Sequence, residues 1–138
     1  MAQFTIYGEP QGKARARTVR SGGKTHSYTP KKTADYETLI AKAFLATGET
    51  GYFEKEPLSV KIIAYFQMPK KTSKKQRQQM LDDVIRPTKK PDTDNIAKII
   101  CDGLNGVAYG DDAQVVELSV CKYWTDEDPR VEVSLWEL

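Results

Sequence analysis

The chain has a single histidine, His26, and two cysteines, Cys101 and Cys121, that lie far apart in the sequence. Zinc sites use closely spaced His and Cys ligands, so this scarcity argues against a zinc enzyme. It also argues against a disulfide-rich secreted fold. The cysteines are typical of free thiols in a reducing compartment, and the alternative at this point is one disulfide between them.

Long hydrophobic runs are missing as well. No stretch approaches the length of a transmembrane helix, and residues 3–7 alternate where a signal peptide would have a charged start and an apolar run. We therefore expect a cytoplasmic protein with no membrane contact and no small-molecule cofactor. The length of 138 residues, with 39% hydrophobic and 29% charged residues, fits one globular domain spanning residues 1–138.

Acidic residues are nearly absent from two segments. Residues 10–32 contain seven Lys or Arg and no Asp or Glu, and residues 69–90 contain eight against two. We call these segments the first and second basic arms. Most charge runs are only solvated surface, but lysine and arginine also neutralise the phosphates of nucleic acids. The candidate DNA contacts are Lys13, Arg15, Arg17 and Arg20 in the first arm and Lys74, Lys75, Arg77, Arg86, Lys89 and Lys90 in the second.

Hydrophobic periodicity predicts an α/β fold with a mixed sheet of about four strands and two to three helices. Alternating residues predict strands over residues 3–7, 58–68, 114–124 and 130–138. Apolar residues at helical spacing predict helices over residues 33–46 and 93–104, and a short polar helix is expected within 73–81. The first arm is too polar to build a core, so we expect it to form a surface arm or hairpin.

Acidic residues are concentrated between the second arm and residue 114. Asp92 and Asp94 stand where an extended segment turns into a predicted helix, and Asp111 and Asp112 follow in a predicted turn. Mg²⁺ prefers oxygen ligands and keeps several waters, so two to four converging carboxylates suffice to bind it. An acidic metal pocket between two basic arms indicates an enzyme that acts on a polyanion, most plausibly nucleic acid.

Such a pocket suits phosphodiester hydrolysis. A bound cation polarises the phosphoryl oxygen and activates water, and Lys98 beside the carboxylates can offset charge that builds up on the phosphate. The alternative is purely structural: Asp92 caps the helix, and Asp94, Lys98 and Asp102 form i,i+4 pairs on its surface. A calcium loop does not fit, because position twelve of that pattern is Gly103 instead of Glu.

These residues resemble a known family. The pattern Pro91-Asp92-x-Asp94-Asn95-x-x-Lys98, then Asp102-Gly103-Leu104-Asn105-Gly106 and Asp111-Asp112-x-Gln114-Val115, is similar to that of the RusA-type Holliday junction resolvases. These are small endonucleases often carried by bacteriophages and prophages. The stretch from Gly8 to Arg17 resembles the basic N-terminal motif of the family.

The resemblance implies a homodimer that binds four-way DNA junctions and makes paired, symmetric nicks in recombination and repair. It also implies Mg²⁺ as the cofactor, with Mn²⁺ as a substitute. By motif position, Asp92, Asp94 and Asp112 are the metal ligands, with Asp111 as a further candidate, and Lys98 completes the catalytic set.

Two other functions are compatible with the residues. A non-catalytic module would bind branched DNA and use the acids only to brace the helix. A metal-dependent nuclease of different specificity would cut flaps or single strands. The presence of Mg²⁺-dependent products distinguishes the first alternative, and preference for a four-way junction distinguishes the second.

Overall fold

A mixed four-stranded sheet forms the centre of the protein. The computed structural model describes residues 1–48 and 52–138. The strands are β1 (Ala2–Tyr7), β4 (Leu58–Gln67), β5 (Val115–Thr125) and β6 (Arg130–Glu137), in the order β1-β6-β4-β5. Strand β6 is antiparallel to β1 and β4, whereas β4 and β5 are parallel. The prediction of one α/β domain with a mixed sheet of about four strands is confirmed.

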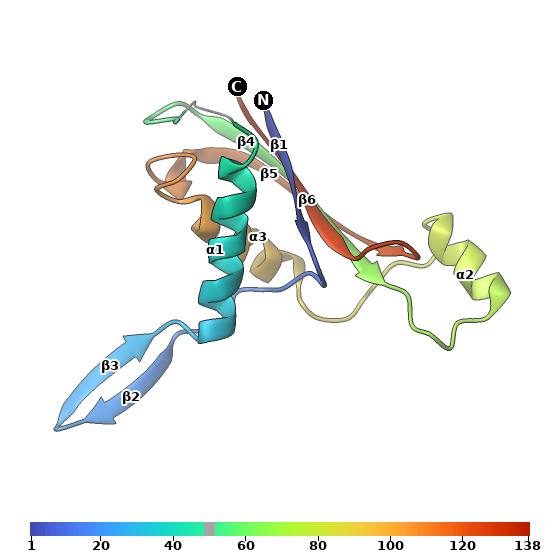
Figure 1. Cartoon of the computed structure of the whole chain (residues 1–138), viewed down its shortest axis with the longest axis horizontal. Coiled ribbons are helices and arrows are strands. Elements are labelled where there is room, and N and C mark those ends of the chain that lie inside the picture. Colours follow the sequence, from blue (N-terminus) through green and yellow to red (C-terminus); the bar gives the residue numbers. More distant parts are fainter. Residues whose placement is uncertain (49–51) are drawn as a thin grey trace.

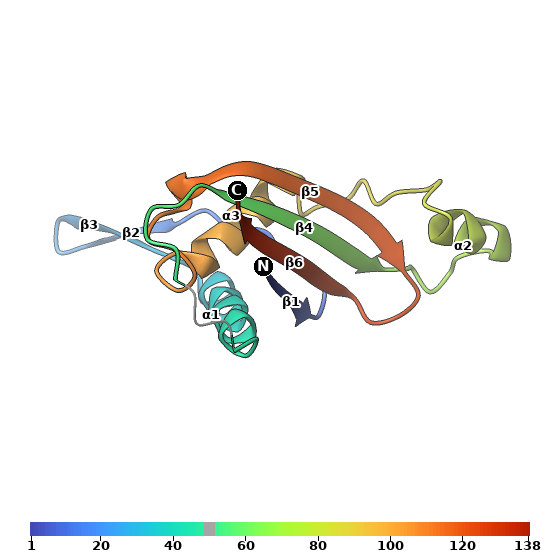
Figure 2. The same ribbon diagram turned by 90° about the horizontal axis from the view of Figure 1, so that it is seen from above.

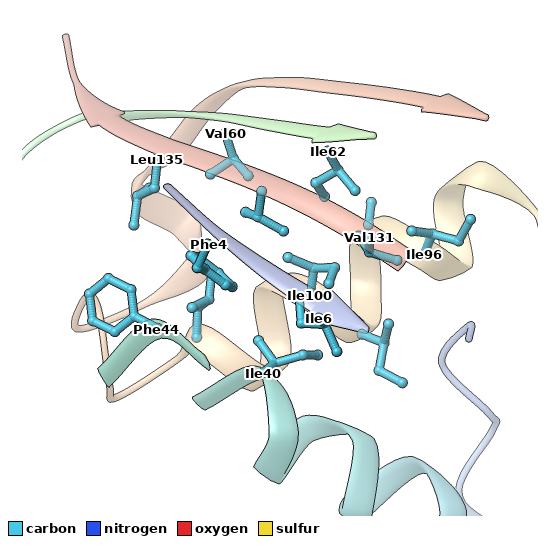
Figure 3. Close-up of a cluster of buried hydrophobic side chains, with 14 of the residues drawn as sticks. Phe4, Ile6, Ile40, Phe44, Val60, Ile62, Ile96, Ile100, Val131 and Leu135 are labelled. Carbon is cyan, nitrogen blue, oxygen red and sulfur yellow. The ribbon is translucent and has the colours of Figure 1, made fainter. Parts of the chain in front are cut away.

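Two helices, α1 (Lys31–Leu45) and α3 (Thr93–Leu104), pack on one face of this sheet (Figure 1). Figure 3 shows the buried side chains between the strands and these helices. Ile40 on α1 and Ile100 on α3 are fully buried there, as the helical spacing predicts. The helices cross closely at Gly103, where an added Cβ would lie 2.9 Å from the Cβ of Ile40. This contact requires a residue without a side chain.

In the described part of the chain, no helix covers the opposite face of the sheet (Figure 2). Alternation therefore divides each central strand into a buried row and a more accessible row. In β4, Val60, Ile62 and Phe66 are buried against the helices, while Lys61 is exposed on the other face. The alternation that predicts a strand over residues 58–68 thus corresponds to the two faces of β4.

Two polar elements project from opposite ends of the molecule (Figure 1). One is the hairpin of β2 (Arg17–Ser21) and β3 (Lys24–Tyr28), in which every residue is exposed. The other is α2 (Lys74–Leu81), which begins after its N-cap Ser73 and buries only Met80. The hairpin belongs to the first basic arm and α2 to the second, so these parts of the two arms extend away from each other.

The edge strand β5 differs from its predicted pattern. Val116 and Leu118 are 60% and 49% exposed, although the alternation of this strand resembles that of a half-buried one. β5 borders β4 on one side only, and the register shifts at Leu58 and Ser59 where the two strands begin to pair.

Among the described helices, none is long and apolar enough to span a membrane.

Candidate active site

The first two acids lie where α3 begins. Asp92 is the N-cap residue, and its backbone carbonyl accepts the hydrogen bond from Ile96 N at 3.0 Å. Its side chain makes no capping hydrogen bond, so the interpretation of Asp92 as only a helix cap does not hold. Asp94 is exposed in the first turn and makes no hydrogen bond or ion pair with the residues described. Both carboxylates therefore remain available to a ligand.

The base of the first basic arm packs against this helix start. An added Cβ at Gly12 would lie 2.8 Å from the Cβ of Pro91 and 3.0 Å from that of Asn95. Lys13 N donates a hydrogen bond to Asn95 O at 2.9 Å. The arm as predicted, from residue 10 to residue 32, therefore has a docked base and a free tip, because residues 10–13 are part of the packed body.

Lys13 is a structural residue at this base. Its Nζ lies 2.8 Å from Glu37 Oε1 and 3.1 Å from Asp102 Oδ2. Burial lowers the pKa of Lys13, but the hydrogen bonds and charges of Glu37 and Asp102 raise it further, so the net shift is upward. Two carboxylates thus pair with the ammonium of Lys13, and its contact with DNA stays a prediction.

Lys98 lies one turn after Asp94 on α3. Its Nζ is 3.4 Å from Asp102 Oδ1, and its side chain is 57% exposed. Asp94, the other predicted i,i+4 partner, does not pair with it in the described structure. The alternative of a surface chain of ion pairs is thus only half formed, and Lys98 stays accessible.

The later pair of acids divides into two roles. Asp111 caps the short helix η1 (Asp112–Gln114) and accepts a hydrogen bond from Ala113 N at 3.2 Å. The Gln114 amide oxygen accepts hydrogen bonds from Gly110 N and Asp111 N, both at 3.0 Å, which completes a capping box. The bond from Ala113 lowers the pKa of Asp111. Asp111 is therefore committed to holding the turn.

Asp112 lies across a cavity from residues of α3. Its pKa is raised, first by its hydrogen bond with Asp111 and then by burial. The charge of Lys98 lowers the pKa of Asp112, and the charge of Asp102 raises it. Asp112 lines a cavity of about 340 Å³ together with Asp94 and Lys98. Three of the four predicted catalytic residues thus surround one cavity.

Asp92 lines a neighbouring cavity of about 490 Å³, between the start of α3 and the base of the first arm. Lys90, Arg17 and Lys32 border the same cavity. Within the described residues, no three His, Cys, Asp or Glu side chains are gathered closely enough to hold a metal ion. The carboxylates nevertheless offer the oxygen donors that Mg²⁺ uses, and two or three suffice because this ion retains waters.

The predicted DNA contacts fall into two groups. Arg77 pairs with Asp126 at 3.0 Å, and Arg86 donates to the carbonyl of Lys122 while lying 3.8 Å from the centre of the Tyr123 ring. Arg77 and Arg86 thereby hold the second arm against β5 and the loop that follows this strand. Among the predicted DNA contacts, those that are exposed and make no ion pair in the described structure are Arg15, Arg17, Arg20, Lys74, Lys75, Lys89 and Lys90.

Sequence reasoning missed Lys122. This residue lies on β5, in register with Ala64 of β4. Burial lowers the pKa of Lys122, and the charge of Asp92 opposes that shift. The signal was present in the alternation, because Lys122 continues the inward row of Val120. Cys101 is buried, and desolvation raises the pKa of its thiol. Both described cysteines are free, which rules out the single disulfide.

Comparison with known proteins places these features in a family. The model of the family described as Endodeoxyribonuclease RusA matches residues 7–136. The chain is also 39% identical over 142 residues to the uncharacterized protein YqaN of Bacillus subtilis (strain 168), covering 99% of this chain and 96% of that one. Both matches span the positions of the acids, Lys98 and the two arms. This chain belongs to the RusA endodeoxyribonuclease family.

Proposed function

We propose that this protein is a Mg²⁺-dependent endonuclease that resolves four-way DNA junctions by paired, symmetric nicks, in recombination and repair. The main observation in its favour is the cavity that Asp94, Lys98 and Asp112 line. Asp92 stands two residues before Asp94 with its side chain free of the capping role. Family membership supports an endonuclease that acts on DNA.

Each residue has a role that follows from its environment. Asp92, Asp94 and Asp112 would hold Mg²⁺, or Mn²⁺ in its place. That ion, when bound, polarises the phosphodiester and activates water. Lys98 is exposed next to these acids, so its ammonium stabilises negative charge that develops on the phosphate. Asp111 holds the turn that carries Asp112 and is not a metal ligand in this proposal.

The exposed cations hold the DNA backbone. The β2–β3 hairpin and α2 project from opposite ends of the body (Figure 1), with the site between them. A branched substrate presents backbones in several directions, which suits contacts so widely spaced. Phosphate neutralisation gives binding that is independent of sequence and falls steeply with salt.

We further propose that the active form is a homodimer. A symmetric pair of subunits presents two identical sites to two related strands, which paired nicking requires. The surface that supports this is the edge of β5, where Val116 and Leu118 are exposed and Leu118 also borders the cavity with Asp94 and Asp112. Sedimentation equilibrium of the chain and of Leu118→Glu tests it: we expect a dimer for the first and a monomer for the second.

The decisive experiment uses an end-labelled four-way junction with matched duplex and forked DNA, in Mg²⁺ or in EDTA. We expect symmetric nicks at the junction only with Mg²⁺, and no product from Asp94→Asn, which removes a charged ligand with almost no change in shape. Asp94→Asn should still bind the junction in EDTA. Equal cutting of forks and junctions would replace the proposal with a nuclease of broader specificity. Tight binding without any product would leave only a junction-binding module.

A further inference from the structure

The end of β5 carries a lysine where the fold faces inward. Lys122 lies beside Ala64 of β4, and two residues further on Trp124 lies beside Phe66. Phe66 is 1% exposed and belongs to the core. The alternation of β5 therefore directs Lys122 to the side of the sheet on which α3 packs, and to the end of the sheet at which Asp92 begins that helix.

A second lysine reaches the same place from the second basic arm. Lys122 Nζ lies 5.2 Å from the centre of the Phe66 ring, and Lys89 Nζ lies 5.5 Å from the same point. Lys89 Nζ is also 5.3 Å from the centre of the Trp124 ring. Lys122 Nζ donates a hydrogen bond to the carbonyl of Lys89, which fixes the arm to the strand. Two ammonium groups are thus held over one aromatic platform.

The two ammonium groups have no counter-ion in direct contact among the residues described. Neither lysine forms an ion pair with a carboxylate among the residues described. Burial lowers the pKa of Lys122, the charge of Asp92 raises it, and the charge of Lys89 lowers it again. The net shift of the Lys122 pKa is downward. In addition, the indole Nε1 of Trp124 is buried without a hydrogen-bond acceptor. The cluster has donors and positive charge, and no anion is in direct contact with it among the residues described.

Contacts between a cation and an aromatic ring hold an ammonium in place without cancelling its charge. Two like charges kept together in this way repel each other, and an anion between them would remove the repulsion. A phosphodiester group carries one negative charge and several acceptor oxygens, so it matches two ammonium donors. Asp92, which follows Lys89 by three residues in the chain, belongs to the proposed active site, so the anion is assigned to the same substrate.

We propose that Lys89 and Lys122 form a clamp for one backbone phosphate of the DNA strand that passes Asp92. This inference rests on the proposed function for its substrate. The clamp positions the strand and takes no part in bond breaking. It also gives the contacts of Lys122 with Phe66 and Lys89 a purpose that core packing alone does not explain, since an apolar residue would fill that space without repulsion.

Salt dependence gives a quantitative test. Each duplex phosphate that a protein neutralises contributes about 0.9 to the slope of log affinity against log salt. Because the two lysines share one phosphate, Lys89→Gln and Lys122→Gln should each remove most of one such contribution. The double variant should remove about 0.9 in all, and not the roughly 1.8 expected of two separate contacts. Affinity at low salt should fall on the order of tenfold.

The binding assay uses the labelled junction in EDTA, so that cleavage does not enter. Lys42→Gln/Lys61→Gln is the matched control: Lys42 is exposed on α1 and Lys61 on the helix-free face of the sheet, and both are outside the proposed DNA contacts. This control should keep the wild-type slope, and Lys122→Arg should retain most of the affinity. An unchanged slope in the Lys89→Gln/Lys122→Gln chain would overturn the clamp, and so would an additive loss.

A second readout does not depend on junctions. In a Trp136→Phe chain, Trp124 is the only indole, and Lys89 lies over its ring. Titration with a short oligothymidine in EDTA should change the Trp124 fluorescence, and the change should disappear in the double lysine variant. A lack of junction preference together with this fluorescence change would refute the proposed function and keep the clamp. Normal junction cleavage without any fluorescence change or slope effect would refute the clamp and keep the proposed function.

Discussion

Replacement of Lys13 by Met tests whether the base of the first arm is structural. Lys13, Glu37 and Asp102 have side chains that are 22%, 19% and 19% exposed, and the ammonium contacts both carboxylates. Methionine keeps the aliphatic length and removes the charge. Two neighbouring carboxylates would then face each other with less compensation, and Asp102 would keep only its longer contact with Lys98 at 3.4 Å.

The magnitude lies between two known limits. Exposed ion pairs contribute about 0–1 kcal/mol, whereas removing one partner of a buried pair costs about 3–5 kcal/mol. Because all three groups are about four-fifths buried but still reach solvent, we expect a loss of about 2 kcal/mol in the free energy of unfolding. For a domain of this size that corresponds to a decrease in Tm of roughly 6 to 8 °C. Urea unfolding followed by circular dichroism measures it.

The pH dependence gives the same test a sign. The pKa of folded Lys13 is raised above its ordinary value of 10.5, so its contribution to stability is fully present below that value and is lost as the pH rises through the folded pKa. The stability difference between wild type and Lys13→Met should therefore shrink above about pH 10.5. A loss below 0.5 kcal/mol at neutral pH, combined with a shallower salt slope for DNA binding, would refute the structural role and restore Lys13 as a DNA contact.

Two further substitutions separate structure from chemistry. Asp111→Ala should cost about 1 kcal/mol of stability, the typical value of a lost cap, and retain metal-dependent cleavage, whereas Asp112→Asn should retain stability and lose cleavage; the opposite outcome would exchange their roles. Gly12→Ala should destabilise by about 1–2 kcal/mol, because its Cβ would overlap Pro91 and such overpacking outweighs the entropy gained from losing a glycine. A thermal melt at or above that of wild type would show that the arm base can shift without cost.

Much of the fold follows from local patterns. Helix α3 spans Thr93–Leu104 as its apolar spacing predicts, and β4 and β6 begin at the predicted residues Leu58 and Arg130. These elements have one face in the core, so the spacing of their apolar residues predicts which side chains are buried. β5 is the exception among the strands: at an edge, solvent reaches Val116 and Leu118 on the face that alternation assigns to the core.

The site was predictable only in part, because residue spacing does not say which charges already have partners. Asp111 and Asp112 are adjacent and chemically identical, yet one caps a turn and the other lines the cavity. Lys122 was missed because a single lysine in an apolar alternation resembles the end of a strand. Its significance comes from Lys89, which lies 33 residues earlier and meets it only through the packing of the second arm.

In the folded chain, some charged side chains form ion pairs or caps and others remain unpaired, a difference that composition alone does not show. Lys13, at the base of the first arm, and Arg77, on α2, form ion pairs with acids of the body. These pairs fix the arm base and α2 to the body. The cations beyond them, on the β2–β3 hairpin and the rest of α2, have no such partners in the described structure. The same division separates the capping Asp111 from the uncommitted Asp92 and Asp94. These unpaired charges of both signs are exposed and solvated in the free protein, and the phosphate backbone and cation of the proposed function would offer complementary charges to both.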